Sequence, residues 1–171
     1  MRLKSFAVLT ALLLAAGAAT LPAKADTVLT LTDANQSIDG SGTLIYDVTV
    51  TNTGTSTVYF NGDNYTDTLP TGVNEPTLDD SAFWNTFPLS LDAGQSYMGE
   101  LFAIDVPVGA PQGVYSGTFY VLGGGDGNTY DDLASVNFSA NVAPEPSSLV
   151  LLGTGLCGTV AYVRRRRTSI Q

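Results

Sequence analysis

The sequence contains no histidine and a single cysteine among its 171 residues. Lysine and arginine are confined to the two ends of the chain, since all seven lie at positions 2, 4, 24 and 164–167. Residues 26–143 therefore lack every histidine, cysteine, lysine and arginine side chain. This absence excludes nucleophile–histidine triads, most zinc sites and basic phosphate sites from that segment, so we expect a protein that is not an enzyme. It also excludes disulfides there, although the segment has the features of an exported domain.

Acidic residues are concentrated where basic ones are missing. Of the 16 Asp and Glu residues only Glu145 lies outside residues 26–143, so this segment carries 15 carboxylates and no base. Such a charge repels phosphate backbones, which excludes nucleic acid as a partner. Two interpretations of the carboxylates remain open: they keep the domain soluble by self-repulsion, or divalent cations bind some of them.

The first 25 residues have the pattern of a secretory signal peptide. Arg2 and Lys4 precede an apolar run at 6–19, and Ala23-Lys24-Ala25 forms an A-x-A cleavage site. We expect signal peptidase to cleave after Ala25, so that the mature chain begins at Asp26. The domain proper then spans residues 26–143.

The other end of the chain has three consecutive parts. Pro144-Glu145-Pro146 is expected to be extended, because proline fixes φ and removes a backbone donor. Residues 148–163 predict a membrane helix, whose apolar or small residues 149–163 span about 22 Å. This length is short of a hydrocarbon core of about 30 Å, and flanking arginines can bridge the difference by snorkelling. Arg164, Arg165, Arg166 and Arg167 would hold that end in the cytoplasm. The alternatives are a plain C-terminal anchor and a buried helix with a basic tail.

The order of these three parts resembles the PEP-CTERM sorting signal of bacterial surface proteins, over residues 144–167. The resemblance implies that Pro144, Glu145 and Pro146 are recognised by an exosortase-type processing enzyme and that this protein is its substrate. It implies a chain anchored in the inner membrane before processing and at the cell surface or outside the cell afterwards. It also implies an association with exopolysaccharide and biofilm.

Residues 26–143 alternate apolar and polar side chains with the period of two that is typical of half-buried strands. The alternation predicts that one face of each of two strands is buried, at Leu44, Tyr46, Val48 and Val50 and at Ala134, Val136, Phe138, Ala140 and Val142. Further strands are predicted at 26–32, 57–60, 65–69, 95–106 and 113–122. Residues 70–88, with Phe83, Trp84 and Phe87, are expected to form a loop or short helical turn that closes one end of the core. An aromatic ligand platform is the alternative for these three residues.

About seven or eight short strands with no amphipathic helix between them predict an all-β fold, a single antiparallel β-sandwich. Residues 87–94, 102–107 and 113–117 resemble the later strands of immunoglobulin-like surface domains. In those domains a tyrosine near the start of the penultimate strand braces a corner, and the resemblance assigns that role to Tyr115. A jelly roll is the alternative.

Two carboxylate-rich segments are the only candidates for site chemistry, at 61–67 and 126–132. Oxygen ligands in flexible turns are what calcium requires, and the candidate ligands are Asp63, Asp67, Asp126, Asn128, Asp131 and Asp132. Asp, Asn and Gly are also the usual turn residues, so we expect no cofactor and keep Ca²⁺ as the alternative. A carboxylate pair of a glycosidase would have to come from residues such as Asp79, Asp80, Glu100 and Asp105.

Three functional hypotheses follow. The first is an exported surface or extracellular-matrix protein with a structural or adhesive role. The second is a calcium-assisted carbohydrate-binding module, and the third is a carboxylate-based glycosidase.

Overall fold

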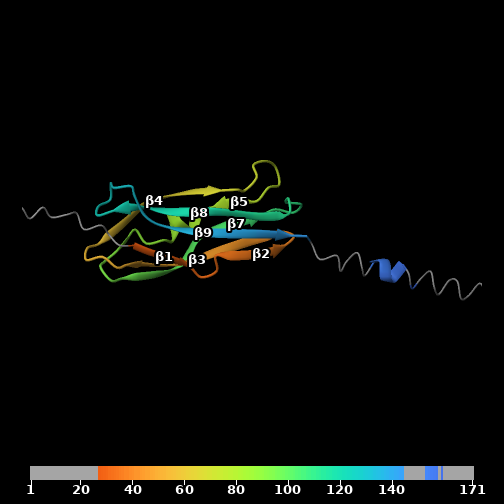
Figure 1. The fold of residues 1–171 in the computed structure, drawn as a ribbon, viewed down its shortest axis with the longest axis horizontal. Helices are drawn as coiled ribbons and strands as arrows, with labels where there is room; N and C mark the ends of the chain where they lie inside the picture. Colours follow the sequence, from red (N-terminus) through yellow and green to blue (C-terminus); the bar gives the residue numbers. More distant parts are fainter. Residues whose placement is uncertain (1–26, 145–152, 158, 160–171) are drawn as a thin grey trace, which may run out of the picture.

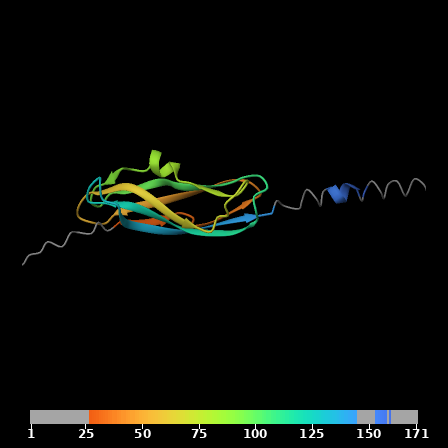
Figure 2. The same cartoon turned by 90° about the horizontal axis from the view of Figure 1, so that it is seen from above.

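The computed structural model describes residues 27–144, 153–157 and 159. Two β-sheets form the domain (Figure 1). The first sheet contains, in spatial order, β1 (Thr27–Leu31), β3 (Gly42–Asn52), β7 (Ser96–Val106) and β5 (Thr77–Asp79). The second contains β2 (Asn35–Asp39), β9 (Asp131–Ala143), β8 (Gly113–Gly124), β4 (Val58–Asp67) and β6 (Ser90–Leu91). One short helix, α1 (Ser81–Asn85), lies between β5 and β6 in the chain and on the outside of the two-sheet body (Figure 2).

The predicted alternation is confirmed in the long strands. In β3 the side chains of Leu44, Tyr46, Val48 and Val50 are buried, and in β9 those of Val136, Phe138, Ala140 and Val142 are buried, with Ala134 half-buried. The inner faces of the two sheets meet through aromatic rings. Phe102 of β7 stacks on Phe119 of β8 with ring centroids 4.9 Å apart, and Tyr46 stacks on Phe102 at 4.6 Å. Burial of a large side chain contributes about 1.5–3 kcal/mol, so this stack holds the sheets together.

Strand pairing differs from the predicted all-antiparallel arrangement in one place. β2 runs parallel to β9, with Ile38 beside Val142 and Asp39 beside Ala143, whereas the other pairs are antiparallel. The prediction is wrong for this pair because β1 and β2 are not joined by a hairpin: β1 pairs with β3 in the first sheet, and β2 pairs with β9 in the second. The chain instead passes directly from the edge of the first sheet to the edge of the second.

β4 is also different from its prediction. Residues 57–60 and 65–69 were expected to be separate strands around a turn, yet residues 58–67 form one continuous strand. The pairing of β4 with β8 shifts between Phe60 and Gly62, so Asn61 forms a β-bulge. Beyond the bulge the pairing continues to Asp67, and the strand does not end. The described residues contain nine strands rather than seven or eight, because β5 and β6 have only three and two residues.

Tyr115 has the bracing contact that the resemblance assigned to it. It lies near the start of β8, and its hydroxyl donates a hydrogen bond of 2.9 Å to the carbonyl oxygen of Pro111 in the preceding connection. The ring also packs against the core. The β7–β8 connection is therefore tied to the strand that follows it.

Candidate functional site

The end of β9 is the first functional feature, because the candidate sorting motif begins there. Val142 is buried, and the backbone N–H of Gly40 donates a hydrogen bond of 3.2 Å to the carbonyl oxygen of Ala143. Pro144 has no N–H and cannot continue the ladder, so the strand ends at Ala143. β9 therefore ends at the residue before the motif, at one end of the two-sheet body (Figure 1).

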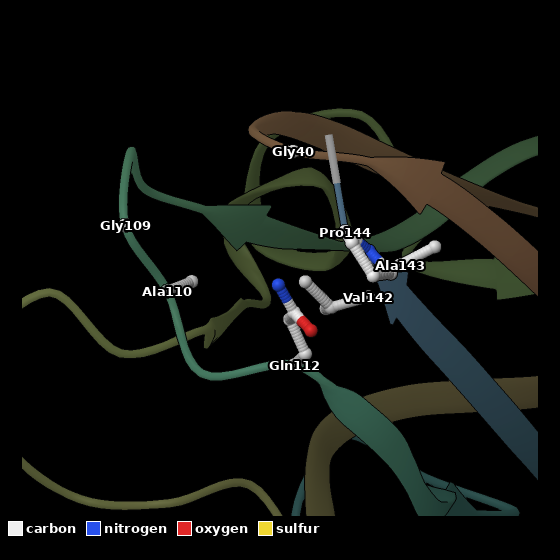
Figure 3. Close-up of a pocket in the computed structure, with 7 residues that line it drawn as sticks. All are labelled: Gly40, Gly109, Ala110, Gln112, Val142, Ala143 and Pro144. Carbon is white, nitrogen blue, oxygen red and sulfur yellow. The ribbon is translucent and has the colours of Figure 1, made fainter. Parts of the chain in front are cut away.

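An open hollow of about 330 Å³ lies beside the end of β9. Figure 3 shows Gln112 and Val142 pointing toward it, with Gly109 and Ala110 across from them. Gly40, Ala143 and Pro144 complete the lining. None of these seven residues is titratable, so the hollow offers shape and backbone polarity rather than acid–base chemistry.

The six predicted calcium ligands fall on three elements. Asp63 and Asp67 are on β4, Asp126 and Asn128 are in the β8–β9 loop, and Asp131 and Asp132 begin β9. Asp67 accepts a hydrogen bond from the N–H of Leu69, and Asp126 accepts one from the N–H of Asn128, which lowers the pKa of the Asp126 carboxyl. The carboxylates of Asp67 and Asp126 therefore accept hydrogen bonds from the backbone two residues further on, as Asp side chains do in turns. No group of three or more His, Cys, Asp or Glu side chains suited to a metal ion occurs in residues 27–144, 153–157 and 159.

Asn61 nevertheless brings the two carboxylate-rich segments together. Its side-chain amide donates hydrogen bonds of 2.8 and 2.7 Å to the carbonyl oxygens of Asp126 and Thr129. The bulge in β4 thus holds the β8–β9 loop in place. The interpretation of 61–67 as a flexible turn is wrong, because these residues belong to a paired strand.

The three aromatic residues in and after α1 differ in burial. Phe83 and Phe87 are buried and stack on each other with centroids 5.0 Å apart, so they close the core as expected. Trp84, the residue after Phe83 in the helix, is 59% exposed. Its ring packs edge-on against Phe83 at 5.3 Å. Only Trp84 is therefore available as a ligand surface.

A carboxyl pair that the sequence does not predict lies between β4 and α1. Asp63 shares a side-chain hydrogen bond with Asp80, the residue before α1. Burial and then the negative charge of Asp80 raise the pKa of Asp63 from 3.8 to about 6. The two residues are 17 positions apart with no motif between them, so only the folded structure reveals the contact.

The other candidate residues for a glycosidase, Asp79, Glu100 and Asp105, do not contact the Asp63–Asp80 pair in any of the interactions described below. Asp79 accepts a hydrogen bond from the N–H of Ser81, which lowers its pKa. Asp105 accepts one of 2.7 Å from the Thr43 hydroxyl across the first sheet, and Glu100 lies opposite Asp47 on the same sheet. Asp80 faces Asp63 and Glu100 faces Asp47, so two of the four candidates lie near another carboxyl group.

Comparison with known proteins identifies the segment that follows the domain. Residues 142–167 match the PEP-CTERM protein-sorting motif. The chain carries a PEP-CTERM sorting motif. The match includes the last two residues of β9 and extends through the arginine cluster, which confirms the predicted resemblance. The motif indicates export to the cell surface and processing by an exosortase.

The comparisons with curated proteins and with solved structures identify no further family. No curated protein matches the chain. One solved structure that aligns with the chain is the secreted serine protease VesC from Vibrio cholerae, at 12% identity and a TM-score of 0.42. The aligned region covers 68% of this chain and 23% of VesC, so this chain spans less than a quarter of that protein.

Several predicted residues of the PEP-CTERM motif and the leader lie outside the described residues. These are Ala23, Ala25, Glu145, Pro146 and Arg164 to Arg167. The expected helix at 148–163 overlaps the described residues only at 153–157 and 159, which are helical, with Cys157 exposed and not in a disulfide. Within the portion of the chain that is described, no helix is long and apolar enough to span a membrane.

Proposed function

We propose that the chain is a surface or extracellular-matrix protein whose domain is an immunoglobulin-like β-sandwich with a structural or adhesive role, in association with exopolysaccharide or biofilm. Three features support the immunoglobulin-like assignment. The first strand is divided between the two sheets as β1 and β2, β2 is parallel to the last strand, and Tyr115 braces the connection before β8.

The observation that carries the proposal is the continuity between β9 and the PEP-CTERM motif. Val142 and Ala143 belong both to the packed strand and to the matched segment. Cleavage beyond Pro144 would leave every strand of the domain intact. The sorted product is then a complete folded domain whose exit point lies at its surface.

We infer the following path for the protein. Signal peptidase cleaves after Ala25, and the apolar residues 148–163 hold the exported chain in the inner membrane with the arginine cluster in the cytoplasm. The exosortase then acts at Pro144-Glu145-Pro146. The base-free segment 26–143 lies between two positively charged ends, a charge distribution that favours its placement outside the membrane.

We also infer that the domain is not an enzyme. Glycosidases with two carboxyl groups hold them about 5 Å or more apart, so that a sugar bond fits between them. Asp63 and Asp80 instead share a direct hydrogen bond. Asp47 and Glu100 are the other opposed carboxylates described above, on β3 and β7 of the first sheet. We assign general acid and base roles to neither pair, and the role that we propose is binding or cohesion.

The proposal is tested in the native host with the gene deleted and then restored. The wild-type chain is expected to return the protein to the cell surface, measured by its sensitivity to added protease, and to restore the cohesion of the biofilm. Pro146→Ala is expected to remain in the membrane fraction and to restore neither, whereas Ser169→Ala, beyond the arginine cluster, is the matched control. A surface-located protein without any effect on cohesion would contradict the adhesive role, and a wild-type protein that never reaches the surface would contradict sorting.

A further inference from the structure

Two exposed aromatic rings from different elements converge on one point of β4. Trp84 of α1 is 59% exposed and Tyr130 of the β8–β9 loop is 63% exposed. A Cβ atom placed on Gly62 would lie 3.3 Å from Cε1 of Tyr130 and 3.9 Å from Cη2 of Trp84. The two rings therefore lie side by side over the Gly62 backbone, and we call these three residues the Trp84–Gly62–Tyr130 surface.

Both rings are held in position although they are exposed. Trp84 packs edge-on against the buried ring of Phe83. The loop that carries Tyr130 is fixed by the two hydrogen bonds from Asn61 to the carbonyl oxygens of Asp126 and Thr129. A tryptophan that keeps more than half of its area in water leaves apolar surface unburied, and pre-positioned exposed aromatics are typical of binding surfaces.

The Asp63–Asp80 carboxyl pair lies at the same part of β4. Asp63 follows Gly62 and pairs with Val121, so its side chain is on the other face of the strand, and Asp80 lies one helical turn before Trp84. Residues 27–144 contain no lysine, arginine or histidine, so no side chain of the domain can neutralise the pair. An amine from outside would form charge-assisted hydrogen bonds with both carboxylates.

We propose that the Trp84–Gly62–Tyr130 surface and the Asp63–Asp80 pair bind a polysaccharide whose sugars carry free amino groups. The C–H face of one pyranose ring packs on Trp84 and Tyr130 by dispersion, and the ammonium group of a neighbouring sugar of the chain contacts the two carboxylates. Charge complementarity selects this ligand, because a domain with 15 carboxylates and no base repels uronic-acid polymers. The inference rests on the proposed matrix role and names its ligand class and site.

The test measures binding of the protein, purified as its own cells process it, to glucosamine oligosaccharides by titration calorimetry. N-acetylglucosamine oligosaccharides and polygalacturonate are the comparison ligands. We expect binding to the free-amine sugar only, reduced about tenfold by Trp84→Ala and by Tyr130→Ala. Met98→Ala, on the other sheet and 73% exposed, is the matched apolar control and should bind like the wild type.

The carboxyl pair is tested in the same assay. Asp63→Asn and Asp80→Asn should each weaken binding about tenfold, while Asp47→Asn on the exposed face of β3 should not. Equal or tighter binding of the acetylated sugar, or unchanged binding in Trp84→Ala, would overturn the inference. Failure of this inference leaves sorting untouched, because a wild-type protein that is processed and retained at the surface but ignores all three sugars contradicts only the ligand and its site.

Discussion

The backbone N–H of Gly40 donates a hydrogen bond of 3.2 Å to the carbonyl oxygen of Ala143. Ala143 is the last residue of β9, and β2 and β8 pair with β9 on its two sides near that end. The PEP-CTERM motif therefore begins at a position that is fixed relative to the domain. An exosortase that recognises Pro144-Glu145-Pro146 must act directly after the last residue of a packed strand.

Gly123 provides a sharp test of the pairing between β4 and β8. A Cβ atom at this position would overlap the carbonyl oxygen of Tyr59, so Gly123→Ala must displace the neighbouring strand. We expect a loss of about 2 kcal/mol in the free energy of unfolding, measured by urea denaturation. Gly125→Ala is the matched control, because nothing lies within 4 Å of its Cβ position, and it should change stability little. Equal effects of the two substitutions would contradict the strand register.

The bond from Tyr115 to Pro111 makes a separate prediction. Tyr115→Phe keeps the ring but removes the hydroxyl that donates to the Pro111 carbonyl oxygen. The expected cost is about 1 kcal/mol in the free energy of unfolding. Tyr120→Phe on the same strand serves as the control. A wild-type stability in Tyr115→Phe would show that the contact does not brace the β7–β8 connection.

The Asp63–Asp80 pair predicts how stability depends on pH. The folded state raises the pKa of Asp63 from 3.8 to about 6, so the proton is bound more tightly in the folded state than in the unfolded chain. The resulting stabilisation is fully present below pH 3.8 and is lost as the pH rises through 6. Asp63→Asn should therefore be more stable than the wild type at pH 7 and lose this advantage in acid. Two pKa units correspond to about 3 kcal/mol, which partial exposure of the pair reduces to about 1 kcal/mol.

Asp79→Asn gives the opposite sign and is the natural comparison. The hydrogen bond from the Ser81 N–H lowers the pKa of Asp79, so its contribution to stability is present above the ordinary pKa and is lost as the pH falls. The two pH profiles, followed by thermal unfolding, should therefore diverge. Parallel profiles would contradict the assignment of the raised pKa to Asp63.

The long strands could be predicted from the sequence because each buries one face and exposes the other. The alternation of Tyr46, Val48 and Val50 in β3 leaves a signal that needs no knowledge of the partner strand. β2 gives no such signal, since Ile38 is its only large apolar residue and its parallel pairing depends on where the chain changes sheets. β4 was divided in the prediction because Asn61 and Gly62 are turn residues that here form a bulge.

The candidate sites divide in the same way. The sorting motif can be predicted from the sequence because its residues form one continuous segment of the chain. The contact between Asp63 and Asp80 and the convergence of Trp84 and Tyr130 arise from the packing of α1 and the β8–β9 loop against β4. The separation of exposed Trp84 from buried Phe83 also required knowing that the segment is a helix.

The central claim is that an exosortase processes this chain at its PEP-CTERM motif, and the intact mass of the protein isolated from its own cells tests it most directly. We predict a mature chain that begins at Asp26 and ends at or near Pro144-Glu145-Pro146, with the mass of any attached group added. Residues 147–171 should be missing. A mature protein whose C-terminus is still Gln171 would contradict the account.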